Sequence, residues 1–186
     1  DRESKPRDIQ KVSTLRPEVP ANLSTIALDL IQGENNQSKR HVYRFFDNAV
    51  RGVTIVYPGE GDAVVIAPLE ECYEAITVSM DSNLYGQVDP YSAGAYAVAE
   101  GIRNVISVGG KPIAATDCLN YGNPEKPEVF FDFEQGVQGI ADACQALSFI
   151  PGEALPIVSG NVSFYNESKQ GSAVVPSPVI VVVGKV

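Results

Sequence analysis

Apolar residues recur at three- and four-residue intervals in four parts of the chain, and this spacing predicts four helices. We expect them at 22–33, 41–50, 89–110 and about 128–147. The third is the best defined, because Asp89 and Pro90 provide an N-cap followed by proline at the first helical position. Gly109 and Gly110 then supply a left-handed stop.

Short runs of apolar and β-branched residues predict five strands, at 63–67, 75–80, 113–116, 157–159 and 179–183. The first two are separated by a turn-prone acidic stretch and suggest an antiparallel pair. The last is apolar on both faces, which is typical of a central strand. This order of elements predicts an α+β domain with a mixed sheet that helices cover mainly on one face. The other face would remain apolar, so we expect it to pair with a like domain.

The first twenty residues differ from the rest of the chain. They are charged, carry three prolines and show no amphipathic period, so 1–20 is expected to be a linker or an arm. Residues 21–186 are then a single nucleotide-binding-type α+β domain. A chain that opens on a linker is expected to be a piece of a longer one.

Composition narrows the class of function. The net charge of −9 argues against nucleic-acid binding, because no basic stripe could neutralise a phosphate backbone. Three widely spaced cysteines without a CxxC pair argue against structural zinc and favour a reducing compartment. The polar N-terminus is no signal peptide, and no apolar run reaches membrane-spanning length, so we expect no membrane partner and a cytoplasmic location.

Two polar segments, 117–124 and 159–167, each follow a predicted strand. A strand that ends in Asp, Asn, Gly and Ser presents backbone N–H groups together with hard oxygen ligands, as a nucleotide phosphate and its magnesium require. Gly160 would let the backbone approach a ligand closely, and Asn161 offers a neutral oxygen suited to magnesium. Asp117 alone also fits an Asx-turn, and the second segment also fits a tight turn.

Further polar residues have two interpretations each. Glu100 and Asn104 lie one turn apart on a predicted helix and could bind one magnesium ion, although solvated helix faces show the same spacing. Asp62, at the entry to the first predicted strand, is either a metal- or phosphate-site carboxylate or a turn residue. Asp81, at the end of the second predicted strand, has the same two interpretations.

Segments 117–127 and 159–167 closely resemble the phosphoribosylformylglycinamidine synthase family of purine-pathway ligases, and the short-form synthetase subunit most of all. Shorter stretches match in the same order, namely 89–91, 97–100, 103–104, 110–112 and 176–180. The likeness extends from about Val42 to Val186. It implies the N-terminal domain of the second of two tandem aminoimidazole-ribonucleotide-synthetase-like units, with 1–20 as the connection from the preceding domain. It also implies that two such domains join their sheets.

The family converts formylglycinamide ribonucleotide to its amidine, using ATP and glutamine-derived ammonia from a glutaminase subunit or domain. The resemblance implies that Asp117 and Gly160 contact ATP, that Asn161 holds Mg²⁺ and that Ser163 touches the ribonucleotide. Long-form relatives imply that Asp62, Glu100 and Asn104 are further magnesium ligands. No catalytic residue is expected in this chain, because the family's histidine proton acceptor belongs to the first unit. The isolated chain is therefore expected to be inactive.

Two departures from the family and two other functions stay open. Relatives usually carry arginine near Leu84, and 148–155 looks longer than usual, so it could reshape one wall of the site or bulge outward. The first alternative function is a non-catalytic, structural nucleotide-binding or dimerisation domain of the same enzyme. The second is a related cyclo-ligase or kinase-like protein, which fits the fold but not the two long motifs.

Overall fold

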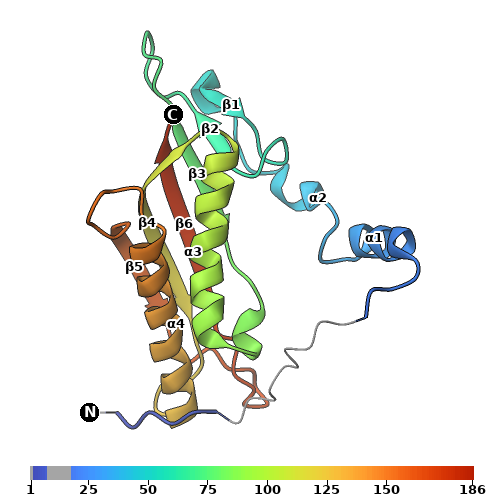
Figure 1. The fold of residues 1–186 in the computed structure, drawn as a ribbon, viewed down its shortest axis with the longest axis vertical. Coiled ribbons are helices and arrows are strands. Elements are labelled where there is room, and N and C mark those ends of the chain that lie inside the picture. Colours follow the sequence, from blue (N-terminus) through green and yellow to red (C-terminus); the bar gives the residue numbers. More distant parts are fainter. Residues whose placement is uncertain (1, 8–17) are drawn as a thin grey trace.

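The computed structural model describes residues 2–7 and 18–186, which include a six-stranded sheet and two long helices (Figure 1). The strands are β1 (Thr54–Val56), β2 (Val64–Ile66), β3 (Ile76–Asp81), β4 (Lys111–Asn120), β5 (Ile157–Ser163) and β6 (Ser177–Lys185). Their spatial order is β1-β2-β3-β6-β4-β5. Only β4 and β5 pair in parallel, whereas the other neighbours are antiparallel. The predicted α+β fold with a mixed sheet and a central last strand is confirmed.

Helices α3 (Pro90–Ser107) and α4 (Pro127–Ala146) lie side by side over one face of the sheet (Figure 1). The α3 N-cap is Asp89, as predicted, and its side chain accepts from the Ser92 N–H. The helices approach closely, because a Cβ added at Gly94 would lie 2.3 Å from the Gly136 backbone oxygen. The core beneath them includes fully buried Ile180 and Val182 of β6.

The opposite face of the sheet is apolar over its central strands. On β3, Thr77, Ser79 and Asp81 are buried under α3, while alternate residues face the other way and Met80 is 73% exposed. On β6, Val179, Val181 and Val183 occupy the same open face and are half-buried. Among the described residues, an apolar face that no helix covers is therefore present, as expected. Its pairing with a like domain stays a prediction.

The segment before the sheet agrees only partly with the sequence pattern. Helix α1 (Leu23–Gln32) begins at the Asn22 N-cap and ends at Gly33, as predicted, but buries none of its residues. The predicted helix over 41–50 is wrong, since α2 (Arg40–Tyr43) is one short turn followed by the 3₁₀ turn η1 (Val50–Gly52). The Asp47 carboxylate accepts from the Ala49 N–H, which closes a local turn and competes with helix formation. Strand β1 was not predicted.

Strands β4 and β5 continue into the first part of each polar segment, as far as Asn120 and Ser163, although the sequence had placed these segments after the strand ends. Residues 117–120 of β4 pair with 177–180 of β6 on one side and with 160–163 of β5 on the other. Because β4 has a neighbour on each side, its ladder hydrogen bonds continue past the end of its apolar run. The polar residues therefore lie within strands.

The predicted 1–20 arm is described only in part, because residues 1 and 8–17 lie outside the described residues. Residues 2–7 have no regular secondary structure and pass the start of α4, where the Lys5 N–H donates to the Pro127 carbonyl at 3.2 Å. The boundary at residue 20 stays a prediction. No helix within 2–7 and 18–186 combines the length and hydropathy needed to cross a membrane.

Candidate functional site

The two polar segments lie side by side at the β4–β5 edge of the sheet. The parallel register aligns Asp117 with Gly160, Cys118 with Asn161 and Asn120 with Ser163. Strand β5 has no partner on its outer side among the described residues, and its residues 157–162 are exposed. The two polar segments therefore meet along this edge. Successive residues of a strand point to opposite faces, so the predicted site residues are divided between the two sides of this edge.

Asp117 and Gly160 occupy the side covered by helices. A Cβ added at Gly160 would lie 2.3 Å from Asp117 Oδ1, so the absence of a side chain there makes room for the carboxylate. Burial raises the pKa of Asp117, while the backbone N–H of Asn161 lowers it. Burial, and then the nearby Asp117 charge, also raises the pKa of Cys144 on α4. Asp117 is thus a half-buried carboxylate between the sheet edge and α4.

Asn161 and Ser163 occupy the open side, within a polar strip of the otherwise apolar open face. The strip comprises Thr116, Cys118, Asn120, Ser159, Asn161 and Ser163. Thr116 Oγ1 donates to the Ser159 carbonyl at 2.8 Å. Asn120 Nδ2 donates to the carbonyls of Cys118 at 3.0 Å and Ser177 at 3.2 Å. Four members of the strip, Thr116, Cys118, Asn120 and Ser159, were not among the predicted site residues, although the first three alternate at the spacing of one strand face.

Beyond the strand ends, the two segments are fastened together. Asn166 Nδ2 donates to the Tyr121 carbonyl at 3.0 Å and to the Ser163 carbonyl at 2.8 Å. Tyr165 adopts a left-handed φ of 61° and its N–H donates to the Gly122 carbonyl at 2.9 Å. Such a conformation is uncommon for a bulky residue and persists only where surrounding contacts hold it. The Asn166 contacts therefore fix the end of the second segment against the first.

A salt bridge joins the same two segments on their exposed side. Lys126 Nζ lies 2.6 Å from Glu167 Oε1. Because of this hydrogen bond from Lys126, the pKa of Glu167 lies below its ordinary value. Tyr165 Oη also donates to Glu125 at 3.3 Å. The contacts explain why residues 121–126 and 163–167 form one unit although about forty positions separate them.

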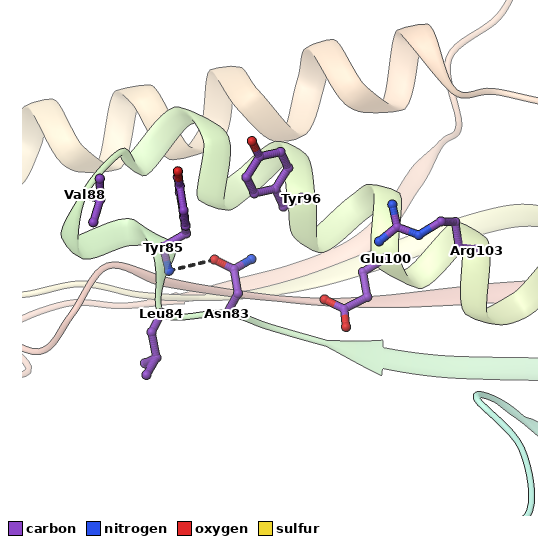
Figure 2. Close-up of a pocket in the computed structure, with 7 residues that line it drawn as sticks. All are labelled: Asn83, Leu84, Tyr85, Val88, Tyr96, Glu100 and Arg103. Carbon is purple, nitrogen blue, oxygen red and sulfur yellow. Dashed lines mark hydrogen bonds between the residues drawn. The ribbon is translucent and has the colours of Figure 1, made fainter. Parts of the chain in front are cut away.

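The other predicted metal ligands lie elsewhere. Glu100 lines a cavity of about 490 Å³ between η2 (Tyr85–Gln87) and α3, where Figure 2 shows it beside Arg103. The Tyr85 and Tyr96 rings meet edge to face there, with centroids 5.3 Å apart. Asp62 lines a different cavity, of about 430 Å³, which also contacts Met80 of the open face.

Asn104 contacts a carboxylate that the sequence had left with two interpretations. Its Nδ2 donates to Asp81 Oδ1 at 2.6 Å, while Asp81 Oδ2 is buried and has no hydrogen-bond partner in the part of the chain that the structure describes. Burial raises the pKa of Asp81, against the opposing effects of Ser79, Asn104 and Arg103. An unpaired buried carboxylate oxygen beside an amide fits a cation. Within 2–7 and 18–186, however, no three His, Cys, Asp or Glu side chains gather as a complete ligand set.

The structure also shows where Leu84 and the 148–155 segment lie, the two expected departures from the family. Leu84 is 65% exposed and lines the cavity next to Tyr85, with Asn83 between it and Glu100 (Figure 2). The 148–155 segment joins α4 to β5, with Pro151, Gly152 and Glu153 exposed. Leu155 at its end is 1% exposed, and its N–H donates to the Cys144 carbonyl at 2.9 Å. The segment is therefore anchored in the core at its end, and its middle lies at the surface.

Comparison with known families matches residues 60–186 to the family described as "AIR synthase related protein, N-terminal domain". A "Phosphoribosylformylglycinamidine synthase subunit PurL" from Methanothrix thermoacetophila is 50% identical over 169 residues, which cover 89% of this chain and 22% of the relative. A PurL from Methanothermobacter thermautotrophicus is 47% identical over 163 residues, 88% of this chain and 22% of that protein. The chain thus spans about a fifth of the length of these curated relatives.

Solved structures from Thermotoga maritima have the same fold. The chain resembles "PurLQS" with a TM-score of 0.70 and 28% identity, over 97% of this chain and 27% of that one. It resembles PurL complexed with ATP with a TM-score of 0.64 and 28% identity, over 99% and 26% of the two chains. PurL complexed with FGAR matches with a TM-score of 0.64 and 30% identity, over 81% and 23%.

Proposed function

Because the chain belongs to the AIR synthase related protein family through that family's N-terminal domain, we propose that it is an ATP- and magnesium-binding domain of a purine-biosynthesis ligase. The ligase would convert formylglycinamide ribonucleotide to its amidine, using ATP and glutamine-derived ammonia. Relatives named as this synthase and matched structures complexed with ATP and FGAR support the proposal. The alignment of Asp117 with Gly160 at the edge where the two polar segments meet is the observation that carries it.

On the covered side, Asp117 and Gly160 would contact ATP. Gly160 presents backbone without a side chain beside the Asp117 carboxylate. A carboxylate repels phosphate oxygens, so Asp117 would meet the nucleotide at an N–H or O–H group or at its cation. The raised pKa of Asp117 is consistent with a group whose charge is only partly solvated.

On the open side, Asn161 would hold magnesium and Ser163 would touch the ribonucleotide substrate. Asn161 is exposed, and the Ser163 hydroxyl is oriented by Asn166 at 3.0 Å. Magnesium would supply charge neutralisation at the transferred phosphoryl group. This chain's own residues would position the reactants, which is the main contribution that phosphoryl transfer requires of a protein.

Calorimetry with Mg-ATP tests the proposal. The chain is titrated alone and as an N-terminally extended polypeptide, with the Gly160→Ala variant of each as the site-specific control. Binding that appears only in the extended polypeptide would place the nucleotide between two synthetase units. Binding in either form that Gly160→Ala leaves unchanged would contradict the proposed site, and so would the absence of binding in both forms.

The proposal includes partners that complete the reaction. The apolar open face, with Met80 largely exposed, would pair with the sheet of the other synthetase unit, and a glutaminase would supply ammonia. His41, the single histidine, is exposed on α2, an element that lies away from β4 and β5 (Figure 1). We therefore propose that this chain alone does not catalyse the reaction. Amidine formation by the purified chain without any partner would contradict this.

A second candidate function is a structural, non-catalytic nucleotide site at the cavity between η2 and α3. The unpaired Asp81 oxygen beside Asn104, together with Glu100 and the Tyr85–Tyr96 ring pair, favours it. Magnesium would be held there by Glu100, which lines this cavity. Further candidate ligands are Asn104 and Asp81, which pair outside the lining, and Asp62, which lines the other cavity. Nucleotide binding that Glu100→Gln abolishes and Gly160→Ala does not would favour this second site.

A further inference from the structure

Within the described part of the N-terminal arm, the Arg7 side chain makes hydrogen bonds to two elements of the domain. Arg7 Nη2 donates to the Gly86 carbonyl of η2 at 2.6 Å, and Arg7 Nε donates to Asp132 Oδ1 of α4 at 3.2 Å. One guanidinium therefore bridges Gly86 and Asp132, which lie more than forty positions apart in the sequence. A planar group with several N–H donors is suited to such a bridge, whereas an ammonium on a flexible stem is a point charge.

The partner of Arg7 is unusually well buried. The Asp132 side chain is 7% exposed, against 29% for Arg7. Burial raises the pKa of Asp132 to about 6, although the nearby Arg7 charge opposes that rise. Without Arg7, an ionised Asp132 would lose its charged partner in a largely desolvated position, which is strongly unfavourable. The pair is therefore far more than a solvated surface contact.

The contact lies at a cavity next to the candidate site. The cavity, of about 210 Å³, is lined by Arg7, Tyr121, Gly122, Glu128, Asp132 and the 173–176 segment. The Tyr121 hydroxyl is buried and has no hydrogen-bond partner within 2–7 and 18–186, and its pKa is raised by burial and by the Asp132 charge. Apart from Arg7, the charged groups around the cavity are the acidic Glu128 and Asp132. The cavity is therefore anionic and matches a guanidinium.

We propose that the Asp132 cavity is a guanidinium-binding site whose resident ligand is Arg7, so that residues 2–7 form a clasp fastening η2 to the start of α4. The Lys5 N–H bond to the Pro127 carbonyl forms part of the same clasp. The inference does not depend on the proposed function, since it concerns the docking of the arm alone.

The clasp weakens in acid. Arg7 holds the pKa of Asp132 below the value that burial alone would give, so docking of the arm is linked to loss of the Asp132 proton. The other titratable groups at the cavity are Glu128 on α4 and Tyr121 after β4, and the η2 and 173–176 walls carry none. As the pH falls through about 6, Asp132 becomes neutral and the arm loosens.

Hydrogen exchange of the Lys5 amide in the 186-residue chain tests the clasp. At pH 7 we expect the Lys5 amide to be protected in the wild type. Arg7→Ala should lower its protection factor at least about tenfold, because one charge-assisted contact is lost. Arg2→Ala removes the same charge from the same arm at an exposed position and should change it less than about twofold. Millimolar methylguanidinium should stabilise Arg7→Ala against heat, and methylammonium at equal ionic strength should not.

Several outcomes would overturn the inference. They are an unprotected Lys5 amide in the wild type, equal protection of that amide in Arg7→Ala, and equal thermal stabilisation of Arg7→Ala by methylguanidinium and methylammonium. Should Arg7→Ala fail to fold, Arg7→Lys replaces it, because it keeps the charge and loses the planar fork. Wild-type protection in Arg7→Lys at both pH 7 and pH 5 would then contradict a guanidinium site.

Discussion

The two sides of the β4–β5 edge differ in how their polar residues are held. On the covered side, Asp117 lies against Gly160 at a spacing that leaves no room for a Cβ. On the open side, Asn161 is exposed in a strip of small polar side chains. Close packing couples a residue to stability as well as to binding, whereas an exposed side chain can be changed with little structural effect. Substitutions on the two sides should therefore separate stability from ligand binding.

The largest effect is expected for Gly160→Ala, on the covered side. The new methyl group would overlap the Asp117 carboxylate, so we expect a loss of about 1–3 kcal/mol of unfolding free energy. ATP affinity of the binding-competent form should fall at least about tenfold, because Asp117 must move. Urea unfolding measures the change in unfolding free energy, and calorimetry measures the ATP affinity. Val158→Ala, at a 69% exposed β5 position, is the control, and an equal loss in that variant would break the comparison.

Asp117→Asn should separate binding from folding. Burial penalises the ionised carboxylate, so the uncharged amide should raise the free energy of unfolding at neutral pH, by no more than about 1 kcal/mol. ATP affinity should fall by about tenfold through loss of a charged acceptor. The exposed α4 residue Asp142 provides the control variant Asp142→Asn. Unchanged ATP affinity in Asp117→Asn would remove the covered side from the site.

The pH dependence of stability should distinguish the two sides as well. Asp117 has a raised pKa in the folded state, so the folded state binds its proton more tightly than the unfolded state does. Its contribution is present below the ordinary value of 3.8 and is lost as pH rises through the folded pKa. Asp117→Asn should flatten that decline in urea midpoints measured from pH 3.5 upward. A new carboxylate on the open side, Asn161→Asp, should leave the slope near that of the wild type.

The smallest structural effect is expected for Asn161→Ala, on the open side. Stability should stay within about 0.5 kcal/mol of the wild type, because the side chain is exposed. ATP affinity should lose part of its dependence on magnesium concentration, by a few-fold, if the amide oxygen is a metal ligand. Calorimetry at two magnesium concentrations measures this. A stability loss as large as that of Gly160→Ala would show that the two sides are not distinct.

The sequence identified most of the elements but misplaced the ends of two strands. Apolar periodicity located α3 and α4, and the Asp89 cap fixed where α3 begins. The sequence pattern predicted that β4 ends before Asp117, because polar residues after an apolar run are typical of a turn. In the structure β4 continues to Asn120, because backbone hydrogen bonds to β5 and β6 extend the strand regardless of side-chain polarity.

Helix α1 shows the same division between local and tertiary information. Its apolar spacing, the Asn22 cap and Gly33 specify a helix, and the helix is present. The same pattern would also predict a buried face, but none of its residues is buried. Spacing along the chain determines which residues share a face, and it contains no information about what covers that face.

The sequence by itself determined which residue types the candidate site contains, because Asp117, Gly160, Asn161 and Ser163 lie in two motifs specific enough to identify the family. Only the tertiary structure decided that the first two lie on the covered side of a sheet edge and the last two on the open side. It alone paired Asn104 with Asp81 and Arg7 with Asp132. The physical reason is that residue types and local periods are encoded along the chain, whereas strand register and long-range contacts depend on the packing of the whole domain.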